Sequence, residues 1–200
     1  MKITECNIVG LYIIEPRIFS DARGFFMESY KSADFADAFG VDIAFVQDNH
    51  SLSHEQGTIR GLHFQSPPYG QGKLVRCTRG KILDVAVDVR KNSPTYGQHS
   101  AVVLSSENAK QFWIPAGFLH GFITRTPMSE VQYKCTAPYM HACEGGVRWD
   151  DPDLAIDWFS QGLDEKNITI SEKDAQGQSF ADFQSPFSFG ETDSGLGEKQ

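Results

Sequence analysis

The chain has 200 residues, a length that suits one domain, and its 40% hydrophobic and 12% aromatic content is enough to build a core. Its formal net charge of −8 excludes the broad basic surface that nucleic-acid and membrane-surface proteins need, so we expect neither partner. An anionic ligand would therefore have to be held by a few local cations inside a pocket.

No apolar run approaches the ~18 residues that span a bilayer. The first residues, MKITECNIVG, lack the basic, apolar and small-residue regions of a signal peptide. The four cysteines, Cys6, Cys77, Cys135 and Cys143, show no CxxC spacing, which favours reduced thiols. Together these patterns predict a cytoplasmic protein.

Short runs rich in Val, Ile, Phe and Tyr recur along the chain and are bounded by Gly, Pro, Asn and Ser. They predict strands at residues 8–15, 24–30, 44–49, 58–65, 73–79, 81–87, 97–104, 111–114, 120–124 and 130–135. A helix is predicted at residues 31–39, where Phe35 and Phe39 share a face, and a helical turn at residues 105–111 with Ser105 or Ser106 as N-cap. Many short strands with few helices indicate a mainly β fold, either a sandwich or a closed barrel such as a jelly roll.

The composition changes after Ala175 to Ser, Gly, Gln, Asp and Glu. We therefore predict one folded domain over residues 1–176 and a polar, flexible tail over residues 177–200. Four phenylalanines in that tail, at positions 180, 183, 187 and 189, are the feature that would let part of it dock on the domain.

The run RGLHFQ at residues 60–65 places an ionisable imidazole, His63, in a strand-like segment. Side chains alternate along a strand, so Leu62 and Phe64 are expected on the face opposite His63. Arg60 lies three residues away and would also point away from His63 on a regular strand. Either a bulge brings the two together or Arg60 reaches round from the rim. Both a core histidine held by a backbone carbonyl and a catalytic base fit this pattern.

A metal site is not expected. Barrels that bind a metal commonly carry two histidines one residue apart, and no HxH occurs in this sequence. His50 and His54 lie four apart, but in a polar loop, NHSLSHEQG, where helical geometry is doubtful.

Three further groups have both a structural and a chemical interpretation. Lys73 in QGKLVRC is either a surface lysine or, if it points inward, a cation that stabilises an oxyanion. Tyr133 and Lys134 are strand neighbours, so only one is expected to face inward. Tyr139 follows a proline and is either a buried structural tyrosine or a ring that stacks on a ligand. The run SEKDAQG at residues 171–177 fits a capped polar turn.

Taken in order, several motifs closely resemble the dTDP-4-dehydrorhamnose 3,5-epimerase family. They are DARGFFMESY, QDNHSLSHEQGTIRGLHFQ, QGKLVRCTRGKILDVAVDVRKNSPTYG, QFWIPAGFLHGF, EVQYKCTAPY, CEGGVRWDDPDLAIDW and SEKD, and they cover residues 3–174. The resemblance implies a cupin-like jelly-roll barrel that works without a metal or other cofactor, usually forms a homodimer and takes a dTDP-linked 4-keto-6-deoxy sugar.

The resemblance also implies roles for individual residues. His63 corresponds to the base, Asp174 in SEKD to its carboxylate partner, Lys73 to the cation beside the enolate, and Tyr133 to the acid on the opposite face. Further positions correspond to substrate contacts, with Tyr139 stacking on the thymine: Arg23, Phe26, Glu28, Gln47, Asn49, Arg60, His120, Tyr139 and Glu144.

The implied chemistry is consistent with these residue types. In a 4-ketohexose the protons on C3 and C5 are acidic because both carbons adjoin the carbonyl. Inversion removes a proton from one face and returns one to the other, which calls for a base and an acid on opposite sides. Arg23 and Arg60 suit the diphosphate, because a guanidinium binds phosphate oxygens bidentately.

Three alternatives remain open from the sequence. The first is a relative on the same scaffold that inverts a single centre or takes another nucleotide-linked ketosugar. The second is a barrel that only binds sugar nucleotides. The third is a metal-dependent oxygenase, which the missing HxH disfavours. The run DWF at residues 157–159 and the long segment up to Ser171 depart from the family pattern, so the position of Asp174 depends on where that segment runs.

Overall fold

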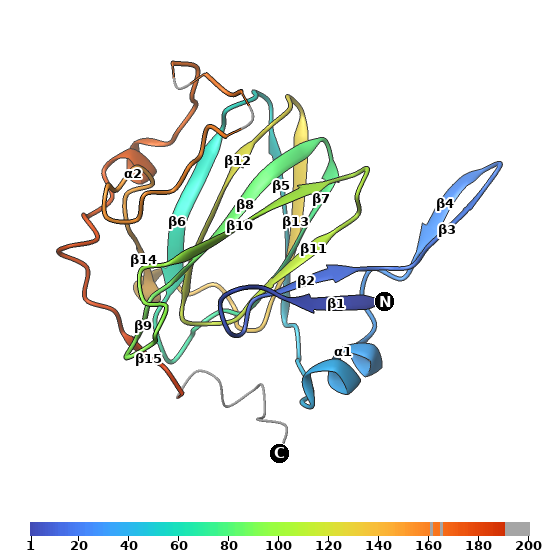
Figure 1. The fold of residues 1–200 in the computed structure, drawn as a ribbon, viewed down its shortest axis with the longest axis horizontal. Helices are drawn as coiled ribbons and strands as arrows, with labels where there is room; N and C mark the ends of the chain where they lie inside the picture. The colour runs from blue at the N-terminus through green and yellow to red at the C-terminus, as the bar shows by residue number, and fades with distance from the viewer. Residues whose placement is uncertain (161, 165, 191–200) are drawn as a thin grey trace.

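The chain folds into two antiparallel β-sheets that face each other in a barrel, as Figure 1 shows for the computed structural model. The structure describes residues 1–160, 162–164 and 166–190. One sheet has six strands in the order β1-β2-β11-β7-β13-β5. Their bounds are Lys2–Glu5, Tyr12–Glu15, Gln111–Ile114, Lys73–Arg79, Ser129–Cys135 and Gln47–Ser53.

The second sheet has five strands in the order β10-β8-β12-β6-β14. Their bounds are His99–Ser105, Lys81–Asp88, Phe118–Thr124, Ile59–Gln65 and Glu144–Gly146. The turn at Gly80 joins β7 of one sheet to β8 of the other. The chain therefore passes between the sheets at this turn, and β7 and β8 do not pair as a hairpin. The mainly β, cupin-like jelly roll expected from the sequence is confirmed.

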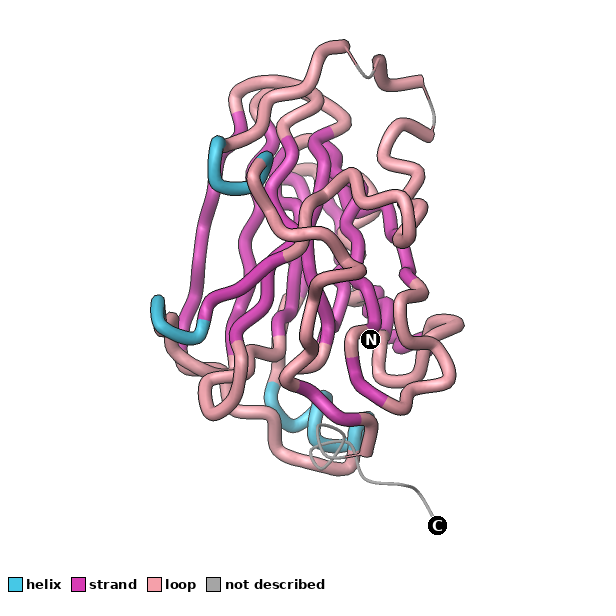
Figure 2. Tube along the Cα trace, turned by 90° about the vertical axis from the view of Figure 1, so that its left-hand side faces the viewer, coloured by secondary structure: helices cyan, strands magenta, loops and turns pink. Residues whose placement is uncertain are grey.

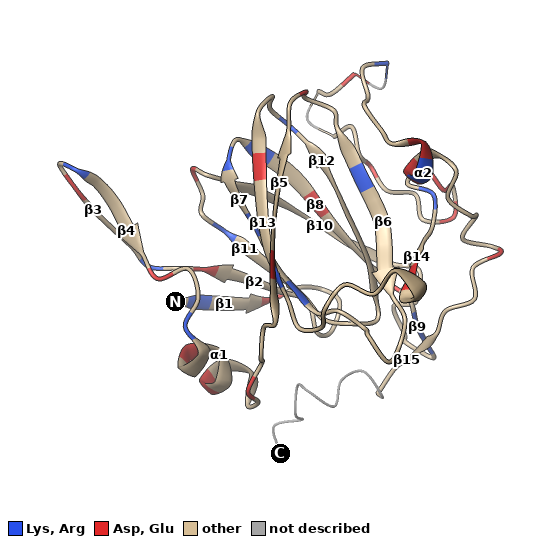
Figure 3. Cartoon of the chain, turned by 180° about the vertical axis from the view of Figure 1, so that it is seen from behind, with Lys and Arg blue, Asp and Glu red and all other residues tan. Residues whose placement is uncertain are grey.

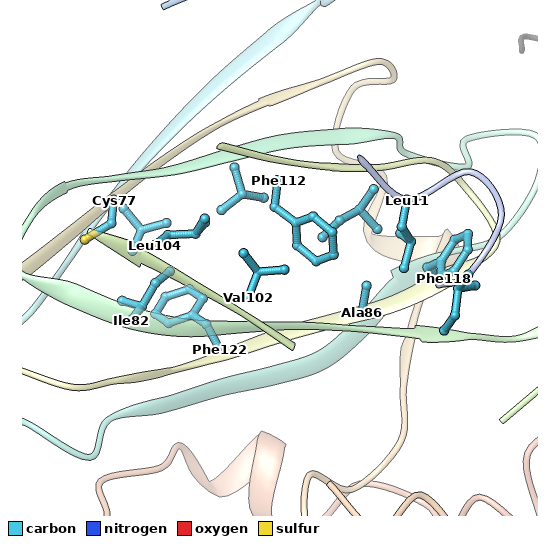
Figure 4. Close-up of a cluster of buried hydrophobic side chains, with 13 residues drawn as sticks. Leu11, Cys77, Ile82, Ala86, Val102, Leu104, Phe112, Phe118 and Phe122 are labelled. Atoms are coloured by element: carbon cyan, nitrogen blue, oxygen red, sulfur yellow. The ribbon is translucent and has the colours of Figure 1, made fainter. Parts of the chain in front are cut away.

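Apolar side chains from the inner faces of both sheets pack against one another between the sheets (Figure 4). Phe112 on β11 packs there with Val102 and Leu104 from β10 and Phe122 from β12, and all are buried. This packing follows from strand alternation, because every second residue of each strand points inward. Polar side chains from both sheets line the pocket described below.

Two further apolar clusters lie on the outer faces of the sheets. Helix α1, Ser32–Phe39, places Phe35 and Phe39 against Trp113 and Leu74 of the six-stranded sheet. The chain after β14 runs as long loops over the five-stranded sheet, where Trp158 is fully buried (Figure 2). Each sheet is thus covered by a segment of the same chain.

The last described residues pack on the barrel. Phe183 and Phe187 are buried, and β15, Phe187–Ser188, pairs in parallel with β9, Arg90–Lys91. The docking that the phenylalanine content suggested therefore occurs for residues up to 190. The division of the chain after residue 176 stays a prediction, and residues 191–200 of the expected flexible tail lie outside the described residues.

Strands β3, Ile18–Asp21, and β4, Gly24–Met27, form a two-stranded hairpin that projects from the barrel (Figure 1). Its apolar side chains are unusually exposed, with Phe25 at 64% and Phe26 at 66%. The Phe26 ring also lies 6.5 Å from the Phe19 ring between centroids, and exposed apolar side chains gathered in this way are typical of docking surfaces.

Several local expectations were wrong. The helical turn expected near Ser105 is an exception, because the Ser105 hydroxyl accepts the Asn108 N–H as an N-cap does and the Ser105 carbonyl accepts the Ala109 N–H. The strand expected at 8–15 starts only at Tyr12, since a turn closed by the Cys6 N–H and the Leu11 carbonyl precedes it. The short β1 and β3 strands were missed.

Charged residues of both signs are distributed over the described strands, and no basic face gathers in the view of Figure 3. No helix in the described part of the chain has both the length and the apolar character needed to cross a bilayer.

Candidate active site

A bulge in β6 decides how RGLHFQ is arranged. On the neighbouring strand β12, His120 pairs with His63 and Phe122 pairs with Arg60, so β6 carries one extra residue between these pairs. Arg60 and His63 therefore line the same pocket despite their odd spacing. Leu62 and Phe64 pack on the outer cluster, on the face opposite His63, as the alternation predicts.

The bulge depends on Gly61. Its φ of +115° lies in a region that L side chains rarely adopt, and a Cβ there would lie 2.6 Å from the Gly121 Cα and 2.7 Å from the His120 carbonyl oxygen. The strands approach this closely because neither glycine has a side chain. The Gly61 N–H points to Asp174, so the bulge also supplies a donor to the site.

His63 is paired with Asp174, as the resemblance implied. The Nε2–H of His63 donates to Asp174 Oδ1 at 2.8 Å, while Oδ2 accepts the Gly61 N–H at 3.1 Å. Because a carboxylate only accepts, Nε2 carries the proton and Nδ1 holds the lone pair that a base needs. The short helix α2, Glu172–Ala175, carries Asp174 and is capped by Ser171, whose hydroxyl accepts the Asp174 N–H.

The Asp174 carboxylate remains ionised in this setting. Burial acts to raise its pKa, but hydrogen bonds from His63, Gly61 and Ser171 together with the nearby imidazole outweigh that effect, and the pKa is lowered. An ionised Asp174 orients the imidazole, and a carboxylate in this position is suited to stabilise an imidazolium.

A second histidine–aspartate pair lies deeper in the same pocket. His120 Nε2–H donates to Asp84 Oδ1 at 2.8 Å, and Asp84 is fully buried. Its other oxygen, Oδ2, has no hydrogen-bond partner among the described residues. Burial lowers the pKa of His120, although Asp84 opposes the shift. Asp84 was missed from the sequence; a carboxylate within the apolar run KILDVAV was the signal that could have identified it.

Lys73 and Tyr133 face this pocket from the opposite sheet. Lys73 begins β7 and Tyr133 lies on β13, whereas His63 and His120 come from the five-stranded sheet. Burial lowers the pKa of Lys73, with Cys135, Asp84 and Glu144 opposing it, and burial raises the pKa of Tyr133. Tyr133 therefore keeps its proton at neutral pH, as an acid must. The neighbouring Lys134 ion-pairs with Asp48 instead of entering the pocket, so the inward residue of the pair is Tyr133.

The pocket bounded by these groups has a volume of ≈ 580 Å³. This is large enough for the sugar part of a nucleotide sugar, within the range of ligand sites. Its lining combines both sheets with the segment leading into α2: Ser51, Thr58, Ile59, Arg60, His63, Lys73, His120, Phe122, Tyr133, Thr169, Ile170, Ser171, Lys173 and Asp174.

A hydrogen-bonded chain of polar residues forms one side of the pocket mouth. Glu144 Oε2 accepts the Tyr139 hydroxyl at 3.0 Å and pairs with Lys173 Nζ at 2.6 Å. The Tyr139 N–H donates to Gln47, and the Gln47 amide donates to Asn49. The structure thus brings four predicted contact residues together near the His63–Asp174 pair. Lys173 was missed, because a lysine in SEKD reads as part of a polar turn.

The structure does not bring all predicted contacts together. Arg23, Phe26 and Glu28 lie on or just after the projecting hairpin, and none of them lines the pocket that holds His63. Arg23 is 90% exposed and its guanidinium is bonded to Asp21 in the same hairpin. Within one chain these residues are therefore not part of the site.

The described part of the chain holds no cluster of three or more His, Cys, Asp or Glu side chains suited to a metal ion. His50, one of the pair in the polar loop, contacts Glu130.

Comparison with known proteins identifies the family. The family described as dTDP-4-dehydrorhamnose 3,5-epimerase matches residues 5–182. The chain belongs to the dTDP-4-dehydrorhamnose 3,5-epimerase family. It is 47% identical over 182 residues to the dTDP-4-dehydrorhamnose 3,5-epimerase of Shigella flexneri, covering 91% of this chain and 97% of that relative.

Solved structures of other members resemble this epimerase-family chain throughout. A dTDP-6-deoxy-D-glucose-3,5-epimerase from Legionella pneumophila Philadelphia 1, in complex with dTDP-4-keto-L-rhamnose, is 45% identical with a TM-score of 0.86, covering 92% of this chain and 94% of that one. A 3'-monoepimerase from Streptomyces bikiniensis, in complex with dTDP-quinovose, is 35% identical with a TM-score of 0.82, covering 88% and 86%.

Proposed function

We propose that this chain is an isomerase that converts dTDP-4-dehydro-6-deoxy-D-glucose to dTDP-4-dehydro-L-rhamnose by inverting C3 and C5. The observation that carries the proposal is the arrangement of His63 and Tyr133, which enter one pocket from opposite sheets. A sugar held between them presents one face to a base and the other to an acid, as inversion requires.

In the proposed reaction His63 Nδ1 removes the proton from the carbon beside the C4 carbonyl, and the electron pair moves to the carbonyl oxygen. Asp174 stabilises the resulting imidazolium through the 2.8 Å hydrogen bond to Nε2. Lys73, on the opposite sheet, stabilises the enolate oxygen. Tyr133 then delivers a proton to the other face of the carbon. The chemistry needs no redox or metal cofactor.

The remaining residues are proposed to hold the nucleotide sugar. Arg60 lies beside His63 in the pocket lining and suits the diphosphate. Tyr139, which is 52% exposed at the mouth, offers a ring for the thymine to stack on. Gln47, Asn49, Glu144 and His120 supply the further polar contacts.

We propose that the functional unit is a homodimer in which each hairpin reaches the partner's pocket. The support is that the exposed hairpin carries both an arginine and exposed aromatic rings, Phe19 at 47% and Phe26 at 66%. This assembly would give Arg23, Phe26 and Glu28 the contacts that a single chain does not. All four cysteines are free thiols, which supports the proposed cytoplasmic location.

The test is NMR of dTDP-4-keto-6-deoxyglucose incubated with the protein in D2O, following the C3 and C5 protons. Loss of both signals, followed by reduction to a sugar of L-rhamnose configuration, is the expected result. His63→Ala should abolish exchange at both carbons. Well-folded protein that exchanges neither carbon would contradict the proposed substrate and favour a binding role.

A single-centre epimerase is the second candidate, favoured by the likeness to the 3'-monoepimerase from Streptomyces bikiniensis. The same experiment separates the two, because a monoepimerase would exchange only one of the two protons.

A further inference from the structure

The segment that follows α2 continues past the active site and packs behind it. After Asp174 the chain runs down the outer face of the five-stranded sheet to β15 (Figures 1 and 2). Phe183 and Phe187, in this segment, are 5% and 2% exposed. They lie on the far side of the sheet from the pocket and line none of it.

Both rings contact the strand residue next to the catalytic base. Phe64 meets Phe183 at 5.5 Å and Phe187 at 5.8 Å between ring centroids, edge to face in each case. Since Phe64 follows His63 directly on β6, the aromatic contact fixes the strand at the point from which the imidazole projects. A shift of Phe64 would move His63 on the other face.

The same segment is tied to the register partner of His63. Gly146 pairs with His63 in the β14–β6 ladder, and its carbonyl accepts the Gln178 side-chain amide at 3.0 Å. The Gln178 carbonyl in turn accepts the Arg148 N–H at 2.9 Å. The chain is therefore anchored only a few residues after Asp174, the other half of the dyad.

The C-terminal end of this segment also contacts the barrel. The Ser185 hydroxyl donates to the Val89 carbonyl. The buried Arg90 guanidinium lies over the Phe189 ring, with its Cζ atom 4.9 Å from the ring centroid. Residues 176–190 thus span from the dyad carboxylate to the far end of the barrel with contacts along the whole path.

We propose that Phe183 and Phe187 are positioning residues for the His63–Asp174 dyad, acting through Phe64. One segment holds the carboxylate at its start and clamps the strand of the imidazole from behind. Catalytic groups must stay within about 0.5 Å of their productive geometry, and a remote change that displaces them by ~1 Å can cost about 10²-fold in rate. The inference rests on the proposed epimerase function.

The test compares the full-length Phe183→Ala/Phe187→Ala protein with Phe159→Ala. Phe159 packs on the same outer cluster, but its ring pairs with Trp149 and not with Phe64. We expect kcat to fall by about 10- to 100-fold in the double variant with KM within about twofold, because the substrate pocket itself is untouched. Phe159→Ala should keep wild-type kcat when measured below its unfolding temperature.

Two additions keep the test decisive. If the double variant does not fold, Phe183→Leu and Phe187→Leu replace it; these retain apolar volume but lose the edge-to-face contact, and should show a smaller fall in kcat with unchanged KM. The downfield ¹H resonance of the His63 Nε2–H should broaden or vanish in the Phe183 and Phe187 variants and persist in Phe159→Ala.

The resonance does not depend on turnover, so it separates the two proposals. Wild-type protein that shows the resonance but no proton exchange would refute the proposed function alone. Folded variants with wild-type kcat and an unchanged resonance would overturn the positioning role, as would a rise in KM that accounts for the whole loss of kcat/KM.

Discussion

Two histidine–aspartate pairs share one pocket, and their environments differ. The His63 side chain is 32% exposed, whereas that of His120 is 9% exposed. An imidazole that meets the open cavity can reach a substrate carbon, and its partner Asp174 is ionised. His120 lies deeper, and burial holds its pKa below the ordinary value, so it stays neutral and suits a hydrogen-bonding role.

Asp174→Asn should lower kcat by about 10²–10⁴-fold while leaving the fold intact. The amide can still accept the Gly61 N–H, but it no longer fixes the protonated Nε2 or stabilises the imidazolium. Steady-state kinetics with circular dichroism check this. Lys173→Met, at the adjacent position on the rim, is the control and should change KM more than kcat; a kcat for Asp174→Asn near wild type would contradict the dyad role.

Lys73 should set the alkaline limb of the rate profile. Because burial lowers its pKa, Lys73 loses its proton below the value of about 10.4 of a free lysine, and the enolate then loses its cation as pH rises. Tyr133 does not contribute there, since its pKa is raised. Lys73→Met should reduce kcat by about 10²–10³-fold and remove this limb.

The profile is measured as log kcat against pH. The matched control is Lys134→Met, the same substitution on a lysine that pairs with Asp48 outside the pocket. A Lys73→Met enzyme that retains the alkaline limb would show that another group titrates there.

At the scale of the elements, strand alternation predicted much of the site. It placed Leu62 and Phe64 opposite His63, and it identified one inward residue in the pair Tyr133 and Lys134. It did not predict that Arg60 faces the same pocket as His63. That arrangement needs the bulge, and the bulge depends on the close approach of β12, a strand about sixty residues later in the chain.

Gly61→Ala should destabilise the protein and displace the bulge. The new Cβ would lie 2.7 Å from the His120 carbonyl oxygen and 2.6 Å from the Gly121 Cα. Relieving these contacts requires the backbone of β12 to move, which costs more than moving a side chain. Gly24→Ala is the matched control, because its φ of +125° imposes similar strain with nothing within 4 Å of the added carbon. Thermal unfolding should show a clearly larger fall in Tm for Gly61→Ala. Equal falls in Tm for the two variants would mean that the strained φ alone accounts for the loss of stability.

At the scale of the whole molecule, the projecting hairpin β3–β4 contributes no residue to the pocket of its own chain. It holds three exposed phenylalanines and an arginine away from the pocket of its own chain. An isologous dimer would place each hairpin at the same position on its partner, so that both pockets are completed together.

Mixing two impaired variants tests this assembly. Arg23→Ala and His63→Ala should each be strongly impaired, and a refolded equal mixture should recover about one quarter of wild-type activity, since half the dimers are mixed and each has one intact pocket. The control mixture of His63→Ala with Lys73→Ala should recover nothing, because both changes lie in the pocket of the same chain. No recovery in the first mixture would contradict the exchanged hairpin.

The sequence by itself determined the class of the fold and the family, and it predicted the residue types of the candidate site. Residue types and their order are local properties, so RGLH, QGK, YKC and SEKD could be recognised along the chain, and the alternation of strands predicted which neighbours share a face. Even the departures around DWF did not displace Asp174, because the Ser171 hydroxyl accepts the Asp174 backbone N–H and the Gly61 N–H donates to the carboxylate.

Only the tertiary structure decided which residues meet. Asp84 pairs with His120 across thirty-six positions and Asp174 with His63 across 111, and no local pattern encodes such contacts. The packing of Phe183 and Phe187 behind Phe64 and the separation of Arg23 from the pocket have the same origin. Strand register and loop paths are set by the burial of apolar surface over the whole barrel, and that free energy is shared by segments far apart in the chain.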